Sequence, residues 1–119
     1  MQKLRIVNES RKSLVADRVD IANNAATRNR GLLKHTGLEN GEGLWIVPCE
    51  GVHTIGMKFP IDVVFLNKQK KIVKIRPAMP KWRLSFCLRA HSVLELPAGY
   101  CQSIGTGVGD QLAFEKYEM

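Results

Sequence analysis

The chain has 119 residues, of which 45% are hydrophobic and 24% charged, and its formal net charge is +7 at pH 7. A chain of this length buries roughly two thirds of its unfolded surface in one domain and needs no disulfide or metal to complete a core. No apolar run approaches the ~18 residues of a membrane-spanning helix, the amino terminus lacks the pattern of a signal peptide, and three cysteines without a CxxC pair favour a reducing compartment. We expect one cytoplasmic domain, residues 1–119, without a transmembrane segment.

The first half of the chain predicts short strands around a single helix. Alternating or continuous apolar residues indicate strands at residues 3–7, 14–21 and 44–47. Between the second and third strands, apolar residues recur at intervals of three and four from Ala22 to Leu33. This spacing predicts a helix whose start is capped by Asn23 or Asn24. Gly31 is expected inside that helix, where it permits close packing on a sheet, and Arg28 and Arg30 on its outer face.

The second half predicts strands only, apart from a turn or short helical piece at residues 98–104. The expected strands cover residues 53–57, 61–66, 71–76, 82–89, 91–96 and 111–117. Residues 82–89 alternate strictly, with large apolar side chains at the even positions, which is typical of a strand whose apolar face lies on the core. Together these elements predict an α+β fold: a small, mainly antiparallel, barrel-like sheet of about eight short strands with one early α-helix.

Asp62 conflicts with the strand in which it lies. Residues 61–66 are apolar on both faces except for this carboxyl group, so the strand is expected to be covered on both sides. An unpartnered charge in such a strand costs several kcal/mol or raises the pKa of the group. We therefore expect Asp62 to form a structural ion pair or turn cap, with Lys58 as the nearest cation and Pro60 bending the chain between them. The alternative is a perturbed carboxyl group in a cleft.

Five motifs, in this order and spacing, carry a resemblance to a known family. They are Arg30-Gly31-Leu32-Leu33, GEGLWIVPC at residues 41–49, HTIGMKFPIDVVFL at residues 53–66, VLELPAG at residues 93–99, and Gly109-Asp110. The chain resembles, from about Val15 to its end, the family numbered 192 among domains of unknown function. That resemblance implies a small bacterial or archaeal protein without an established biochemical activity. It also implies a shared surface or scaffold formed by Met57, Lys58, Pro60, Asp62, Glu95, Gly99 and Asp110.

The cysteines and histidines suggest two further kinds of site. Cys49, His53 and Asp62 have the residue types of a thiol hydrolase, so a cysteine-dependent enzyme is one alternative. Cys49-x3-His53 and Cys87-x3-His91 form two equal spacings that would supply four ligands to tetrahedral zinc. Extended strands hold residues four apart well beyond contact, so we favour core cysteines and backbone-satisfied histidines, and we predict no catalytic residue, no metal and no cofactor.

The positive charge is concentrated in one segment. Between Asp62 and Glu95 there is no acidic residue, whereas the remainder of the chain is close to neutral. This segment, residues 68–89, predicts as an alternative function the binding of an acidic partner such as a nucleic acid, an anionic lipid or an acidic protein. The surface would be formed by Lys68, Lys70, Lys71, Lys74, Arg83 and Arg89. The alternation directs Trp82 and Phe86 away from the arginines and toward the core, so a solvated basic hairpin is the simpler interpretation.

The function that we favour from the sequence is a non-enzymatic accessory or small-ligand-binding domain. Its surface would form where residues 53–62 meet residues 93–99, because alternation places His91 and Glu95 on one face of their strand. The expected ligand-binding residues are His53, Met57, Lys58, Asp62, His91 and Glu95. The partner would be an unknown small ligand or a protein.

Overall fold

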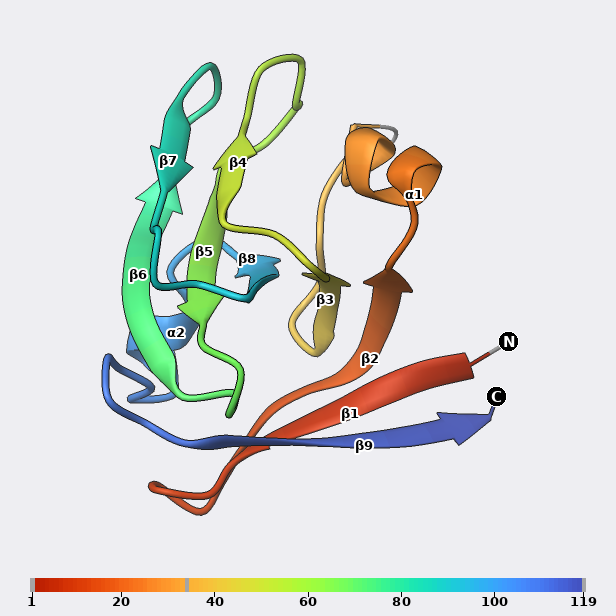
Figure 1. Ribbon diagram of the computed structural model, residues 1–119. Helices are drawn as coiled ribbons and strands as arrows, with labels where there is room; N and C mark the ends of the chain where they lie inside the picture. Colours follow the sequence, from red (N-terminus) through yellow and green to blue (C-terminus); the bar gives the residue numbers. More distant parts are fainter. Residues whose placement is uncertain (1, 34, 119) are drawn as a thin grey trace.

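Seven strands form one mixed sheet that turns through a large angle from one edge to the other (Figure 1). The computed structural model describes residues 2–33 and 35–118. Its elements are β1 (Gln2–Asn8), β2 (Ser13–Ala22), α1 (Ala25–Arg30), β3 (Glu42–Ile46), β4 (Gly51–His53), β5 (Ile61–Leu66), β6 (Ile72–Met79), β7 (Leu84–Phe86), β8 (Ser92–Pro97), α2 (Tyr100–Ser103) and β9 (Leu112–Glu118). The predicted α+β class is confirmed.

The large sheet has the strand order β6-β5-β8-β3-β2-β1-β9, and all of its neighbours are antiparallel except β2 and β3. Its two edge strands approach each other at one end, where Lys71 forms a bridge with Gln111. Backbone hydrogen bonds from Ile72 N to Asp110 O (2.9 Å) and from Leu112 N to Lys70 O (3.0 Å) fix this contact. Within residues 2–33 and 35–118 the two edge strands pair only there, so the sheet is curved and open rather than a closed barrel.

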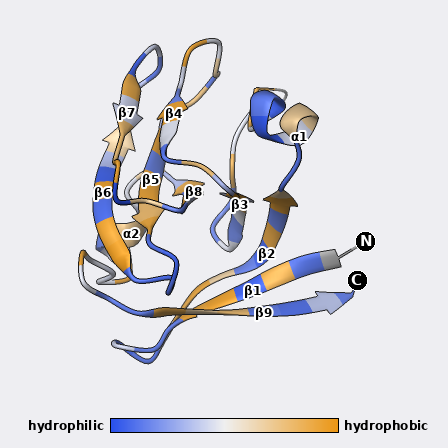
Figure 2. Cartoon of the chain, in the orientation of Figure 1, coloured by the Kyte–Doolittle hydropathy of each residue, from blue (hydrophilic) through white to orange (hydrophobic). Residues whose placement is uncertain are grey.

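Two apolar clusters cover the sheet. Along β1, alternating hydrophobic and hydrophilic residues are visible in Figure 2, and Leu4 and Ile6 enter the first cluster. All six residues of β5 and all six of β8 are buried. Val64 and Leu66 of β5 belong to the first cluster, whereas Val63 and Phe65 belong to the second. The expectation that β5 is covered on both faces is therefore confirmed. Its residues are almost all apolar because both faces of the strand are buried.

A two-stranded ribbon of β4 and β7 is separate from the large sheet. Gly51 pairs with Phe86, and His53 with Leu84. The expected apolar-in orientation of residues 82–89 is wrong: Ser85 and Cys87 are buried, whereas Trp82, Leu84, Phe86 and Leu88 are 64%, 66%, 65% and 79% exposed. Cys87 belongs to the second apolar cluster, and Lys74 Nζ of β6 donates to Phe86 O at 2.9 Å. The ribbon thus lies close to the sheet, and the small residues occupy its inner side.

Two other expected elements differ from the structure. The expected strand at residues 53–57 ends at His53, because Thr54 and Met57 close a turn through a hydrogen bond from Met57 N to Thr54 O (3.1 Å). The expected helix is shorter and carries no buried residue, so its predicted inner face is wrong. Asn24 caps it as expected, but Gly31 ends the helix with φ of 49° instead of lying inside it. A left-handed backbone of this kind favours glycine.

Candidate functional site

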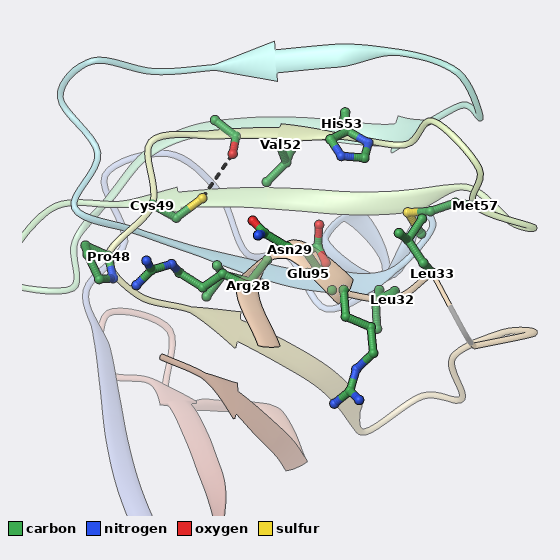
Figure 3. A pocket seen from close by; sticks show the side chains of 14 residues that line it. Arg28, Asn29, Leu32, Leu33, Pro48, Cys49, Val52, His53, Met57 and Glu95 are labelled. Atoms are coloured by element: carbon green, nitrogen blue, oxygen red, sulfur yellow. Dashed lines mark hydrogen bonds between the residues drawn. The ribbon is translucent and has the colours of Figure 1, made fainter. Parts of the chain in front are cut away.

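A cavity of about 400 Å³ opens between α1, the chain from β3 to β4, and β8. Figure 3 shows the side chains that surround it. Its lining residues are Arg28, Asn29, Arg30, Gly31, Leu32, Leu33, Ile46, Pro48, Cys49, Gly51, Val52, His53, Met57 and Glu95. The lining therefore combines aliphatic side chains with two arginines, one thiol, one imidazole and one carboxyl group, a mixture that is typical of small-molecule sites.

Glu95 is the central polar group of this cavity. It lies on β8, in the middle of the large sheet, and its cross-strand neighbours are Leu44 on β3 and Val63 on β5. The residue is only 3% exposed. Among the residues that the structure describes, no side chain or backbone group forms a hydrogen bond or an ion pair with its carboxyl group. Its side chain is directed into the cavity (Figure 3).

Burial has a large effect on this group. Removal from water disfavours the charged form and raises the pKa of Glu95 from 4.5 to about 8. At neutral pH the carboxyl group is therefore mostly protonated and offers one O–H donor and one carbonyl acceptor. Because this carboxyl group faces a cavity, water or a bound molecule can supply the hydrogen bonds that the described residues do not.

The rim of the cavity on the α1 side is basic. The Asn24 side chain accepts a hydrogen bond from Thr27 N (2.9 Å), and this capping box fixes the start of a helix of only six residues. Arg28 and Arg30 follow within that helix and line the cavity. Neither arginine takes part in the ion pairs found among residues 2–33 and 35–118. The mouth therefore presents guanidinium groups that have no acidic partner in the described part of the chain.

Cys49 and His53 lie on the opposite wall, where the chain enters and forms β4. Cys49 Sγ donates to Gly51 O at 3.0 Å (Figure 3). Burial raises the pKa of the Cys49 thiol, with a smaller opposing effect from that hydrogen bond. A protonated thiol is a poor nucleophile, so the environment of Cys49 does not favour a cysteine-dependent enzyme.

The residues expected to bind ligand divide into two groups. His53, Met57 and Glu95 line the cavity, whereas Lys58, Asp62 and His91 do not. Lys58 is exposed in the turn between β4 and β5. His91 contributes backbone hydrogen bonds, donating to Leu66 O (2.7 Å) and accepting from Cys49 N (2.9 Å).

Asp62 has a structural environment. Its carboxyl group accepts hydrogen bonds from Ala78 N (2.7 Å), Gly99 N (2.8 Å) and Cys101 N (2.9 Å). It thereby connects β5 to the end of β6 and to the start of α2. This arrangement is a turn cap, one of the two structural roles expected for it, and its partners are backbone amides rather than Lys58.

Asp110 has a comparable environment at the far end of the sheet. Its Oδ2 accepts from Asn8 Nδ2 (2.9 Å), Gly107 N (2.9 Å) and Arg11 Nε (3.1 Å). Burial alone would raise the pKa of Asp110, but these hydrogen bonds and the Arg11 charge outweigh it and lower the pKa below its usual value. Asp62 and Asp110, which both belong to the sequence motifs, therefore stabilise backbone turns through hydrogen bonds.

The cavity also contains residues that the sequence did not indicate. Arg28 and Asn29 were expected on a helix packed against the sheet, with Arg28 on its outer side, yet both line the cavity because the helix is short and lies at its mouth. The sequence held one signal for this site. The Arg30–Leu33 segment and Glu95 both belong to the motifs that carry the family resemblance, although they are more than sixty residues apart.

The four residues considered for zinc do not form a site. Among residues 2–33 and 35–118, no three histidine, cysteine, aspartate or glutamate side chains lie close enough together to hold a metal ion. Cys87 is buried in the second apolar cluster, whereas Cys49 and His53 are on the cavity wall.

The basic residues considered for an acidic partner are also divided. Lys68, Lys70 and Lys71 lie at or near the β5–β6 turn, which Figure 1 shows at the opposite end of the molecule from the β6–β7 loop. Lys70 Nζ is 5.5 Å and 5.4 Å from the ring centres of Trp45 and Phe114. Lys74 instead lies on β6, where its Nζ donates to Phe86 O of β7, and Arg83 and Arg89 lie on either side of β7 in sequence. Arg89 Nη2 donates to Val73 O (3.2 Å).

The sequence profile of the DUF192 family, described as "Uncharacterized ACR, COG1430", matches residues 6–114. The chain belongs to the DUF192 family. A UPF0127 protein of Pyrococcus abyssi is 32% identical over 115 residues, which cover 90% of this chain and 94% of that protein. A UPF0127 protein of Thermococcus sibiricus is 28% identical over 95% of this chain and 76% of its own length. The family is uncharacterised, so membership in DUF192 does not supply an activity.

Two solved structures share the DUF192 fold. A protein of unknown function from Novosphingobium aromaticivorans superposes with a TM-score of 0.81 at 19% identity, covering 92% of this chain and 82% of that one. A putative transcription regulator from Sinorhizobium meliloti superposes with a TM-score of 0.84 at 20% identity, covering 96% and 94% of the two chains. At these identities the likeness establishes the fold alone. Neither helix in the described part of this chain is long and apolar enough to cross a bilayer.

Proposed function

We propose that this DUF192 protein binds a small organic molecule in the cavity beneath α1. The observation that carries the proposal is Glu95, a nearly fully buried carboxyl group that faces the cavity and lacks a partner among the described residues. Such a group costs folding free energy, and a bound molecule that supplies a hydrogen bond would recover it. Asp62 provides the contrast, because its carboxyl group accepts three hydrogen bonds from backbone amides.

The lining indicates the chemistry of that molecule. Protonated Glu95 can donate to one oxygen and accept from one N–H or O–H group, as in pairing with an amide or a carboxylic acid. Leu33, Ile46 and Met57 supply apolar contact. Arg28 and Arg30 at the rim suit a carboxylate or phosphate group. A small organic anion with an apolar body and a distal polar group fits these features.

The test is a thermal-shift screen against monocarboxylic acids, small organic phosphates and primary amides, followed by calorimetric titration of the compounds that stabilise the protein. Glu95→Met keeps the length of the side chain but removes both the O–H donor and the carbonyl acceptor of the protonated carboxyl group. We expect it to weaken binding of the hits about tenfold or more, the effect of roughly one to two lost hydrogen bonds.

Glu115→Met is the matched control, because it makes the same chemical change on an exposed residue of β9. It should leave the affinities unchanged. The proposal fails if no compound binds, or if Glu95→Met binds the hits as tightly as the natural sequence does.

Two further expectations from the sequence, a cytoplasmic location and an acidic partner, also remain proposals. A cytoplasmic location is supported by three free cysteines, Cys49, Cys87 and Cys101. Contact between residues 68–89 and an acidic partner is supported by the absence of acidic residues from Val63 to Leu94. Nothing in the lining of the cavity favours catalysis over binding.

A further inference from the structure

Five of the seven large hydrophobic side chains that are exposed in the described chain lie on the β4–β7 ribbon or within two residues of it. We define this apolar ridge as Ile55, Trp82, Leu84, Phe86 and Leu88, which are between 43% and 79% exposed. Exposed apolar side chains gathered in this way often mark an interaction surface. We infer that the protein docks through the apolar ridge on a membrane surface that contains anionic lipid.

The ridge is a consequence of strand geometry. Gly51 and His53 of β4 pair with Phe86 and Leu84 of β7, so all four lie on the outer side of the ribbon. A Cβ atom at Gly51 would lie 3.2 Å from Phe86 Cβ, which is closer than ordinary contact. Glycine at this position therefore lets the Phe86 side chain stand free. The buried inner positions, Ser85 and Cys87, are small, so turning the ribbon over would require Phe86 and Leu84 to enter a space sized for them.

Trp82 is held outward by a specific network. Its backbone is left-handed, with φ of 64°, a conformation that costs a bulky residue stability. Thr54 supports it: Trp82 N donates to Thr54 O (3.2 Å), Arg83 N donates to Thr54 Oγ1 (2.9 Å), and Thr54 Oγ1 donates to Pro80 O (2.6 Å). A buried threonine thus fixes an exposed tryptophan at the end of the ridge.

Positively and negatively charged residues lie at opposite ends of the ridge. Lys58, Lys81 and Arg83 are exposed on the two loops at the Trp82 end, and these loops are joined by the Thr54 hydrogen bonds. The acidic residue nearest in sequence to the ribbon, Glu50, is at the Leu88 end, where its backbone O accepts from Cys87 N at 2.8 Å. The Trp82 end should therefore approach a negative surface first.

This combination favours lipid over the other acidic partners. Tryptophan and phenylalanine prefer the membrane–water interface, and flanking lysine and arginine strengthen attachment to an anionic surface by roughly threefold to fivefold each. Leu84 and Leu88, which make up much of the ridge, have no ring on which a nucleic acid base could stack.

Docking would bring the cavity close to the membrane. Gly51, Val52 and His53 of β4 line the cavity, and their partners on β7 form or adjoin the ridge. The inference does not depend on the cavity binding anything. It identifies the acidic partner expected for residues 68–89 as anionic lipid, and it places the contact at the apolar ridge.

The experiment is co-sedimentation with vesicles of phosphatidylcholine alone and of phosphatidylcholine mixed with phosphatidylglycerol, at low and high salt. We expect binding only to the mixed vesicles, a decrease at high salt, and a blue shift of tryptophan emission that Trp82→Phe removes. Leu84→Ser combined with Phe86→Ser should reduce binding at least about tenfold. Lys58→Gln combined with Lys81→Gln should also reduce it, by about tenfold.

Matched controls keep the result specific to the ridge. Leu14→Ser with Val108→Ser removes two exposed apolar side chains elsewhere, and Arg5→Gln with Lys116→Gln removes two exposed cations from β1 and β9. Both controls should bind as the natural sequence does, and so should Glu95→Met, which separates this test from that of the cavity.

Three outcomes would overturn the inference. They are no binding to the mixed vesicles, equal binding by the Leu84→Ser, Phe86→Ser variant, or a dimer in sizing chromatography that this variant dissociates. Binding of single-stranded DNA that depends on the ridge while vesicles do not bind would assign the surface to nucleic acid instead.

Discussion

Asp62 and Glu95 are two carboxyl groups in adjacent central strands, and both are almost completely buried. In the register of β5 and β8, Asp62 lies opposite Leu96 and Glu95 lies opposite Val63. They face opposite sides of the sheet at nearly the same point. Asp62 accepts three backbone hydrogen bonds, whereas Glu95 has no partner among the described residues and faces a cavity. Burial alone therefore does not distinguish a structural carboxyl group from a candidate binding group.

The two carboxyl groups differ in how many backbone N–H groups donate hydrogen bonds to them. The N–H groups of Gly99 and Cys101 converge on Asp62 because the chain turns into α2 there, with φ of 79° at Gly99. On the other side of the sheet, Glu95 meets the aliphatic residues Leu44 and Val63 and the space beneath α1. The fold thus supplies backbone donors to Asp62 and none, among the described residues, to Glu95.

The largest expected effect comes from Asp62→Asn. An amide group would direct its NH2 toward at least one of the backbone N–H donors, because these approach both carboxyl oxygens. We expect a loss of roughly 3 kcal/mol or more in the free energy of unfolding, measured by urea denaturation. Glu115→Gln on the surface should change it by less than about 0.5 kcal/mol. An Asp62→Asn protein as stable as the parent would contradict the structural role.

Glu95→Gln should have an effect of opposite sign that depends on pH. Between pH 4.5 and about 8 the folded protein keeps a proton on Glu95 that the unfolded chain releases. The free energy of unfolding attributable to this group therefore decreases as pH rises through that window and is constant above it. Removing the ionisable group should make the variant more stable than its parent at pH 7, by on the order of 3 kcal/mol.

The same comparison at low pH is the control. At pH 4 Glu95 is protonated in both states, so parent and Glu95→Gln should have similar stabilities in matched urea titrations. A constant difference between the two proteins from pH 4 to pH 9 would show that the carboxyl proton is not involved.

Much of the fold was predictable because strands leave a local signal. The boundaries of β5 match the expectation, and β1, β2, β3, β6, β8 and β9 lie within a few residues of it. The turn at Thr54–Met57 was not predictable, because the hydrogen bonds that close it involve a threonine whose other partners are on the β6–β7 loop.

The orientation of β7 shows a limit of pattern reasoning. Alternation divides Trp82–Leu88 into two faces but does not say which face is buried. Size and hydrophobicity suggested the large residues, yet the ribbon packs through Ser85 and Cys87. Which face of β7 is buried depends on its pairing with β4 and on its contact with β6, and both partners are distant in sequence.

The candidate site was predictable only in part. Glu95, His53 and Met57 were singled out, and the structure brings them to one cavity. Asp62 was recognised as a conflict within its strand, but its donors, Ala78, Gly99 and Cys101, are 16, 37 and 39 residues away. Arg28 and Asn29 were missed because the helix was expected to be twice as long and packed on the sheet.

The most direct test of this account is a ¹³C NMR titration of the glutamate carboxyl groups, with Glu95 assigned by its absence in Glu95→Gln. We predict that Glu95 titrates near pH 8 in the free protein, as a buried carboxyl group without a partner should. It should then shift when a compound enters the cavity. A pKa near the usual 4.5 would mean that Glu95 is solvated or already partnered, and it would contradict the central claim.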